Sequence, residues 1–183
     1  MTSPIADKTG EDNSTETIDV ACSDSVNESL IPPQIIDWVT KTLAHVDKSG
    51  VAVSIKIVDE QEMLQLNTTY RQKDMLTNVL SFPFENTNDT QAFTEIEAEM
   101  ANFIGDVAIC DAVVKTEAAT QGKTYEQHFA HLIIHGVLHL LGFDHIDESD
   151  AAEMENNEIA ILATMGFANP YLTDLKDVKN DHE

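Results

Sequence analysis

Five of the seven histidines in this 183-residue chain lie between positions 128 and 145. Two of them, His135 and His139, are four residues apart, and on an α-helix residues at that spacing share one face about one turn apart. Both imidazoles can therefore bind one cation. A third ligand one turn further along would lie about 5.4 Å away along the axis, whereas zinc–nitrogen bonds measure about 2.0–2.1 Å. The chain must therefore turn back after His139.

Gly142 stands where this turn is needed. Glycine adopts a left-handed backbone at little cost, so a reversal through Phe143 and Asp144 can bring His145 onto the same ion. The resulting spacing, HxxxHxxGxxH, equals that of the metzincin zinc proteases. Three protein ligands leave one tetrahedral position for water, whose pKa zinc lowers to about 7. The sequence therefore predicts one zinc ion bound by His135, His139 and His145, with hydrolysis as its chemistry.

Other residues around the three ligands have more than one interpretation. Gly136 stands where a metzincin has its glutamate general base, which disfavours a metallopeptidase. Asp144 is a candidate base, a residue that orients a ligand, or a turn residue. We expect His128 at the surface or at a helix start. We expect His131 to be a hydrogen-bonded core histidine or a residue that supports a ligand.

The apolar pattern predicts the elements that position these histidines. The apolar run over 125–141 predicts a buried helix, and 148–165 predicts an amphipathic helix with Met154, Ile159, Leu162 and Met165 inward. The remaining pattern predicts helices over 35–46, 60–70 and 112–120 and strands over 51–58, 77–84 and 103–110. Alternating strands and helices indicate an α/β (α+β) domain with a small mixed sheet of three to four strands covered by helices. Pro83 places its strand at an edge or a strand end.

Length and composition indicate one domain with polar ends. Residues 1–30 are polar and aperiodic and predict a flexible acidic arm, 31–167 a catalytic metal-binding domain, and 168–183 an acidic tail. The two cysteines, Cys22 and Cys110, are far apart, which excludes a disulfide framework and a thiolate zinc site and fits a reducing cytoplasm. No signal-like start and no long apolar run occur, so we expect neither secretion nor membrane association.

The net charge of −23 argues against a polyanionic partner at face value. The acids gather in 1–30, 85–100 and 144–183, however, and the middle of the chain is nearly neutral. A local nucleic-acid site in that middle is compatible with this distribution, without long-range attraction. Arg71, the only arginine, has Lys73 nearby and suits bidentate phosphate recognition. The alternative for Arg71 is a surface ion pair with Asp74 or another acid.

Four sequence blocks resemble those of the YbeY endoribonucleases, the bacterial rRNA maturation factors. They occur in the same order and span roughly 32–166. They are Leu66-Asn-x-x-Tyr-Arg-x-Lys-Asp74, Thr77-Asn-Val-Leu-Ser-Phe-Pro83, Gly105-Asp-Val-x-Ile109 and the histidine string 135–145.

The resemblance implies a zinc-dependent, single-strand-specific endoribonuclease that acts in ribosomal RNA processing, especially small-subunit rRNA 3′-end maturation, and in ribosome quality control. It carries the zinc ligands over to His135, His139 and His145, and a role in RNA handling to Arg71. Asp106 corresponds to an aspartate associated with docking to a small-subunit ribosomal protein. A ribosome-assembly GTPase is a further partner that the resemblance implies.

The chain departs from the family pattern at Leu76-Thr77-Asn78, where Pro-Thr-Asp is usual, so the charge of that aspartate is missing. Two other functions are compatible with the sequence. The first is a ribosome-assembly binding module with a structural zinc, for which the acidic ends are easier to explain. The second is the metzincin-like metallopeptidase, which Gly136 disfavours.

Overall fold

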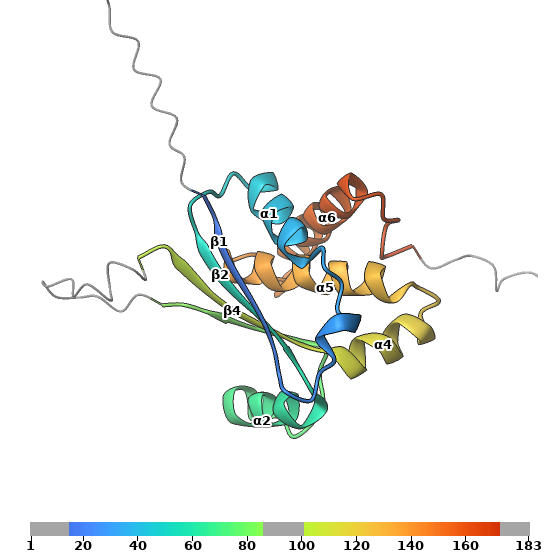
Figure 1. Ribbon diagram of the computed structural model, residues 1–183. Coiled ribbons are helices and arrows are strands. Elements are labelled where there is room, and N and C mark those ends of the chain that lie inside the picture. Colours follow the sequence, from blue (N-terminus) through green and yellow to red (C-terminus); the bar gives the residue numbers. More distant parts are fainter. Residues whose placement is uncertain (1–14, 86–100, 173–183) are drawn as a thin grey trace, which may run out of the picture.

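A computed structural model describes residues 15–85 and 101–172 of the chain. Its centre is a four-stranded sheet in the order β1-β2-β4-β3 (Figure 1). The strands are β1 (Thr17–Cys22), β2 (Ala52–Val58), β3 (Val79–Pro83) and β4 (Phe103–Cys110). The first three strands in that order run parallel, and β3 is antiparallel to β4. This is the predicted small mixed sheet in an α+β domain, with Pro83 at the end of an edge strand.

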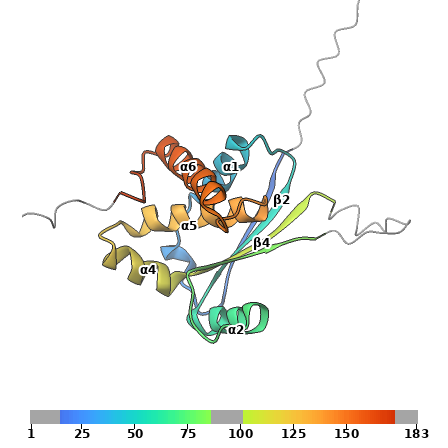
Figure 2. The same cartoon turned by 180° about the vertical axis from the view of Figure 1, so that it is seen from behind.

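Helices cover both faces of the sheet, but unequally (Figures 1 and 2). One face carries α1 (Ile35–His45) and α5 (Tyr125–Leu140), and α6 (Glu148–Thr164) packs on α5. The other face carries α2 (Glu60–Arg71), while α4 (Asp111–Thr120) follows β4 and contacts α5. Alternation along β4 separates the two sides: Val107 and Ile109 join the larger core with α5, and Ala108 joins a smaller core with Met63 of α2.

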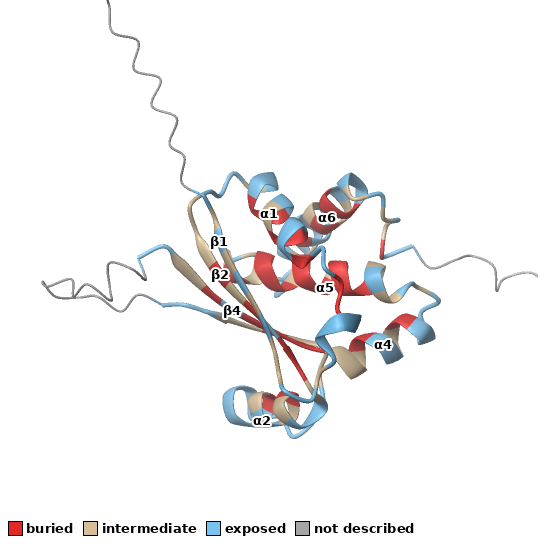
Figure 3. Cartoon of the chain, viewed as in Figure 1, coloured by how far each residue is buried: buried red, intermediate tan, exposed pale blue. Residues whose placement is uncertain are grey.

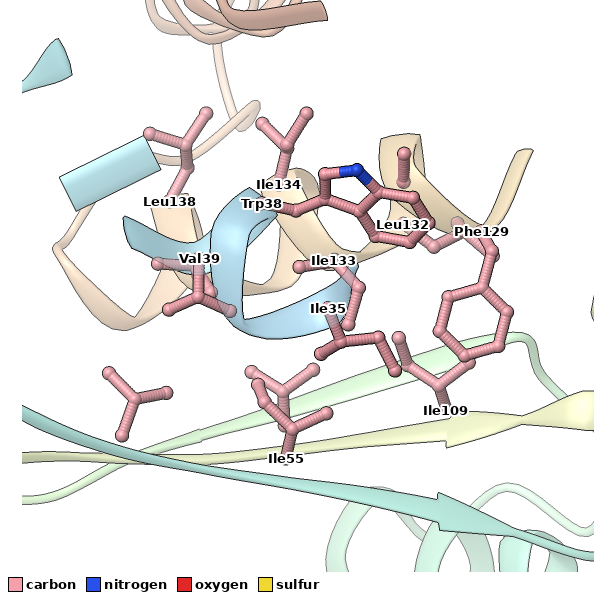
Figure 4. Close-up of a cluster of buried hydrophobic side chains, with 14 of the residues drawn as sticks. Ile35, Trp38, Val39, Ile55, Ile109, Phe129, Leu132, Ile133, Ile134 and Leu138 are labelled. Atoms are coloured by element: carbon pink, nitrogen blue, oxygen red, sulfur yellow. The ribbon is translucent and has the colours of Figure 1, made fainter. Parts of the chain in front are cut away.

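The larger core explains why α5 is apolar on most of its circumference. Ten of its residues are buried (Figure 3), because the helix lies between the sheet and α6. Figure 4 shows Phe129 and Ile133 of α5 above Ile55 and Ile109 of the sheet, with Trp38 of α1 beside them. A helix packed in this way is a rigid support for the polar side chains along the part of its surface that the core does not cover.

The prediction of a flexible arm over 1–30 is wrong for the segment Thr17–Cys22. This segment forms the edge strand β1, paired in register with β2 from Thr17↔Ala52 to Cys22↔Ile57. The alternating side chains Ile18, Val20 and Cys22 pack against the larger core. Three apolar residues within a polar stretch are a weak periodic signal, and pairing with β2 supplies the stabilisation that the segment lacks by itself. Residues 1–14 of the expected arm, nearly all of the acidic segment 85–100 and the tail from 173 onward lie outside the described residues.

The other predicted helices and strands occur within a few residues of their expected ends. In α6 the predicted inward positions Met154 and Leu162 are buried, but Ile159 and Met165 are only partly so. The remaining buried positions of α6 are Ile161 and, unexpectedly, Glu158. None of the helices that the structure describes is long and apolar enough to cross a membrane.

Candidate metal centre

Three histidines converge at the carboxyl end of α5. His135 and His139 lie one turn apart on the stripe of α5 that the core leaves accessible, and their Nε2 atoms are 3.1 Å apart. His145 lies beyond the end of the helix, with its ring centroid 5.1 Å from that of His139 and 5.9 Å from that of His135. One ligand nitrogen from each ring lies within 4.8 Å of the other two. The structure therefore brings together all three predicted metal ligands.

The turn after α5 brings His145 back to the helix. Gly142 has φ +92°, the left-handed region expected of it. Its N–H donates to the carbonyl of His139 at 3.1 Å, and the N–H of Phe143 donates to the carbonyl of Leu138, also at 3.1 Å. Asp144 then accepts a 2.7 Å hydrogen bond from the backbone N–H of His145. This is the contact of a turn residue, and the same Oδ1 also lies 3.9 Å from Nδ1 of His145.

A buried carboxylate that the sequence did not reveal supports the site. Glu158 of α6 has an exposure of 0%, and its Oε1 accepts a 2.7 Å hydrogen bond from Nδ1 of His135. Its Oε2 accepts hydrogen bonds from His131 Nε2, at 3.1 Å, and from the Tyr171 hydroxyl. Carboxylate partners of this kind fix the tautomer and orientation of a metal-binding imidazole. Because Nδ1 of His135 keeps its proton in the hydrogen bond to Glu158, the lone pair of Nε2 is directed at the cluster.

Charge states at the site suit a cation. Burial would raise the pKa of Glu158, but hydrogen bonds from His131 and His135 outweigh burial and hold this pKa at about 2. The carboxylate is therefore ionised. The pKa of His139 is lowered, first by burial and then by the neighbouring His135 and His145. A depressed pKa favours the neutral imidazole, which is the form that binds a metal ion.

The donor set fits a divalent metal such as zinc. Three imidazoles, each with one ligand nitrogen within 4.8 Å of the other two, match the three-histidine sites of catalytic zinc, and the His145 side chain is 60% exposed. A structural zinc site needs a fourth protein ligand that closes the coordination shell. In the part of the chain that the structure describes, the cluster contains the three histidines alone. The site is therefore open to solvent on the His145 side.

His128 and His131 lie on α5 before the histidine cluster and are not part of it. His128 lies at the start of α5, one of its two expected positions. The other, a surface position, is wrong, because its residue exposure is 4% and its Nε2 donates to Glu117 at 2.7 Å. The reason is that α4 packs on this turn of α5 and covers the ring. The prediction for His131 is confirmed: its hydrogen bond to Glu158 makes it a supporting residue rather than a ligand.

Gly136 stands where a metzincin has its glutamate general base, and the structure shows a steric reason for a glycine at this position. A Cβ at this position would lie 2.6 Å from Val107 Cγ1 and 3.3 Å from Ser81 Oγ. The Ser81 hydroxyl also donates a 2.9 Å hydrogen bond to the Gly136 carbonyl. The helix therefore approaches β3 and β4 so closely that this position has no room for a glutamate side chain. A metzincin-type general base is incompatible with this packing.

Comparison with known proteins identifies the family. The model of the family described as "Endoribonuclease YbeY" matches residues 18–166. The chain belongs to the YbeY family. Two curated relatives carry the name Endoribonuclease YbeY. The relative from Alcanivorax borkumensis is 42% identical, over 86% of this chain and 87% of its own length. The relative from Colwellia psychrerythraea is 46% identical, over 74% of this chain and 83% of its own length. The solution structure of TM1509 from Thermotoga maritima has the same fold, with a TM-score of 0.53 and 21% identity over 90% of this chain and all of that one.

The other residues expected from the YbeY resemblance are not part of the histidine cluster. Arg71 ends α2, and Lys73 follows it; both are exposed, and neither forms an ion pair within the described residues. Helix α2 lies on the opposite face of the sheet from α5 (Figure 1). Asp106 is exposed on that same face, where it lines a recess with Tyr70 and Phe82. A loop from α2 leads to the start of β3, next to the metal centre.

Asn78, the departure from the usual YbeY sequence, bridges two elements at the start of β3. Its Oδ1 accepts a 2.7 Å hydrogen bond from the Val79 N–H, and its Nδ2 donates to both carboxylate oxygens of Glu117, at 3.0 and 3.3 Å. An amide provides both the acceptor and the donor that these two partners require. Glu117 was missed in the sequence because a glutamate on a short helix is most often solvated.

Proposed function

We propose that this YbeY protein is a metal-dependent endoribonuclease that cleaves single-stranded RNA. The processes that we assign to it are ribosomal RNA processing, namely small-subunit rRNA 3′-end maturation, and ribosome quality control. The observation that carries the proposal is the convergence of His135, His139 and His145 within 4.8 Å in a chain whose relatives are named endoribonucleases. An open three-imidazole site suits hydrolysis of a phosphodiester, whose oxygen atoms are ligands for a Lewis acid.

The residues that would hold the metal are the three histidines, with one Zn²⁺ per chain. When bound, the ion supplies Lewis-acid polarisation and an acidified water. Glu158 keeps the His135 ring in a single tautomer, and its own hydrogen bonds to His131 and Tyr171 hold the carboxylate in place. Gly136 keeps α5 against the sheet, so that the first two ligands are fixed by the core.

Arg71 and Lys73 supply positive charge for the RNA strand. Both are exposed cations in an otherwise acidic protein, and the loop after them leads to Asn78 at the edge of the metal centre. We assign phosphate binding to both residues, and stabilisation of charge on the reacting phosphate to Arg71. Asp144, which is 45% exposed beside His145, is the available carboxylate for proton transfer.

The partners that we propose are a small ribosomal subunit protein and a ribosome-assembly GTPase, in the cytoplasm and without membrane association. Asp106 supports the first of these, because it is an exposed carboxylate at the mouth of a recess on the α2 face. Docking there would leave α5 and its histidines, on the opposite face of the sheet, uncovered. Partner binding would also compensate for the net charge of −23, which opposes unaided RNA capture.

Metal analysis coupled to cleavage of a labelled single-stranded RNA tests the proposal. We expect about one zinc per chain and cleavage in the wild type, and loss of both in His139→Ala. The matched control is His45→Ala, an exposed histidine of α1 that hydrogen bonds to Asn157 and is not part of the histidine cluster. This variant should keep both properties.

Three results would contradict the proposal. Unfolding on zinc removal without any RNA cleavage by the loaded protein would favour a binding module with a structural zinc. Cleavage of casein, abolished by a chelator, would favour a peptidase. RNA cleavage that persists in His139→Ala would place the chemistry elsewhere.

A further inference from the structure

A recess of about 370 Å³ lies beside the metal centre and shares His135 with it. Its walls come from the start of β3, from α4 and α5, and from the segment after α6; among its lining residues are Asn78, Glu117, Lys123, His131 and Tyr171. We propose that this recess binds one unstacked base of the RNA strand, a base with an exocyclic amino group, next to the phosphodiester that is cleaved. The inference rests on the proposed nuclease function and names a specificity site for it.

The size and position of the recess suit one base. Its volume lies within the roughly 300–1,000 Å³ typical of small-molecule sites. Enzymes that act on nucleic acids commonly hold a single base out of the stack in such a pocket. Since His135 belongs both to the recess and to the histidine cluster, a base in the recess would be separated from the metal centre by one side chain.

Glu117 provides the recognition chemistry. Its carboxylate accepts hydrogen bonds from Asn78 Nδ2, at 3.0 and 3.3 Å, and from His128 Nε2, at 2.7 Å. These contacts fix the carboxylate, while its side chain stays 32% exposed. A carboxylate has about four lone-pair sites, so at least one remains for a ligand donor. Exocyclic amino groups of cytosine, adenine and guanine donate to such a site, whereas the donor on the edge of uracil is a ring N3–H flanked by two carbonyl oxygens, which the carboxylate repels.

The charge balance favours a base over a phosphate. Lys123 is the one ammonium among the described lining residues, and it already donates to Gln121 Oε1 at 2.9 Å and to the Pro170 carbonyl at 3.0 Å. The recess also contains the Glu117 side chain, so its acidic and basic groups balance. A phosphate would face the Glu117 carboxylate, and the acidic protein around it would add to the repulsion. A neutral ligand with donor groups avoids both costs.

One further feature of the wall suits a planar ligand. The Tyr171 ring is held by its hydrogen bond to Glu158 and by an edge-to-face contact with His131, with the ring centroids 5.5 Å apart, and the residue is 42% exposed. An aromatic ring of this kind can stack with a base.

The first test measures base preference with the zinc-loaded full chain. A pool of single-stranded RNAs randomised around the cleavage site is digested, and the cut ends are sequenced. We expect one position next to the cut to disfavour uracil by roughly tenfold, the value of one hydrogen bond to a charged group. Glu117→Gln should reduce this preference to about twofold or less, because Asn78 and His128 compete for its single oxygen. The matched control, Glu126→Gln, changes an exposed glutamate of α5 outside the recess and should keep the preference.

The second test measures binding to the wild-type protein, so it depends neither on RNA cleavage nor on the folding of a variant. Adenosine, cytidine, guanosine and uridine are titrated separately into zinc-loaded wild-type protein, and amide NMR shifts are followed. Saturable shifts at Lys123 and Tyr171 with the three amino-bearing nucleosides, and at least several-fold weaker shifts with uridine, support the inference.

The two tests together separate this inference from the proposed function. RNA cleavage without base preference at any position, or a preference that Glu117→Gln retains, would overturn the base site and leave the nuclease standing. Equal shifts with all four nucleosides, or shifts confined to other surfaces, would also overturn it. Absence of RNA cleavage together with selective nucleoside shifts would overturn the nuclease and leave the base site standing.

Discussion

The Nδ1 atom of His135 lies 2.7 Å from Oε1 of Glu158, a carboxylate with no solvent exposure that comes 23 residues later in the chain. The contact ties the ring of one metal ligand on α5 to α6, and the two helices pack against each other. Burying an ionised carboxylate is costly unless it receives hydrogen bonds, and His131 and Tyr171 supply the others. The core of the domain therefore sets the orientation of a metal ligand.

Glu158→Gln should weaken zinc binding by about 10- to 100-fold. Glutamine retains one acceptor oxygen, so His135 keeps a partner, but the charge that makes this imidazole a better ligand is lost. Zinc affinity measured by competition with a chromophoric chelator checks the prediction. Glu155→Gln, at an exposed position of the same helix, is the matched control and should leave the affinity unchanged. Equal affinities of the two variants would mean that Glu158 has no role in metal binding.

Gly136→Ala should destabilise the domain by about 1–3 kcal/mol through overpacking. At an exposed helix position the same change would stabilise by up to about 1 kcal/mol, so the expected sign is reversed. The new Cβ would lie 2.6 Å from Val107 Cγ1. Urea unfolding of the variant, of Val107→Ala and of the double variant forms a cycle. We expect the double variant to be more stable than additivity predicts; strict additivity would show that contact with Val107 is not the cause.

Arg71→Ala should lower the rate of single-stranded RNA cleavage by about 100-fold if its guanidinium stabilises charge on the reacting phosphate. Zinc content should be unchanged, because Arg71 lies on α2, on the opposite face of the sheet from α5. Lys48→Ala removes one exposed positive charge elsewhere and serves as the control. A rise in KM alone would restrict Arg71 to RNA binding. Unchanged kinetics would remove its assigned role.

Asn78→Asp should make stability depend on pH in a defined direction. The new carboxylate would face Glu117 at the present 3.0 Å contact, and repulsion raises the pKa of the pair in the folded state. An acid whose pKa is raised by folding binds more protons in the folded state, so its stability deficit is largest at neutral pH and shrinks as the pH falls. We expect a deficit of about 1–3 kcal/mol at pH 7.5.

Urea unfolding at pH 7.5 and pH 5.0 checks this prediction, with wild type measured at both values. Asn78→Ala loses the same hydrogen bonds without adding charge, and its deficit should change little between the two pH values. A deficit of Asn78→Asp that is constant or grows on acidification would contradict the expected repulsion.

Local pattern was enough for the helices, for three of the four described strands and for the metal ligands. Helical periodicity of 3.6 and strand alternation of 2 are properties of neighbouring residues, so they are readable in 35–46 or 51–58 without knowledge of the partner. The ligand set is local too: His135, His139 and His145 lie within eleven residues, and Gly142 marks the turn between them.

Tertiary structure alone decided which distant groups meet. Strand β1 depends on pairing with β2, and Glu158 is buried because α6 covers α5. Glu117 meets Asn78 because α4 follows β4, the strand that pairs with β3. In each case the energy comes from a partner more than 20 residues away, and no local pattern carries that information. The sequence by itself therefore determined the metal ligands, and packing between distant elements determined what orients them and what lies beside them.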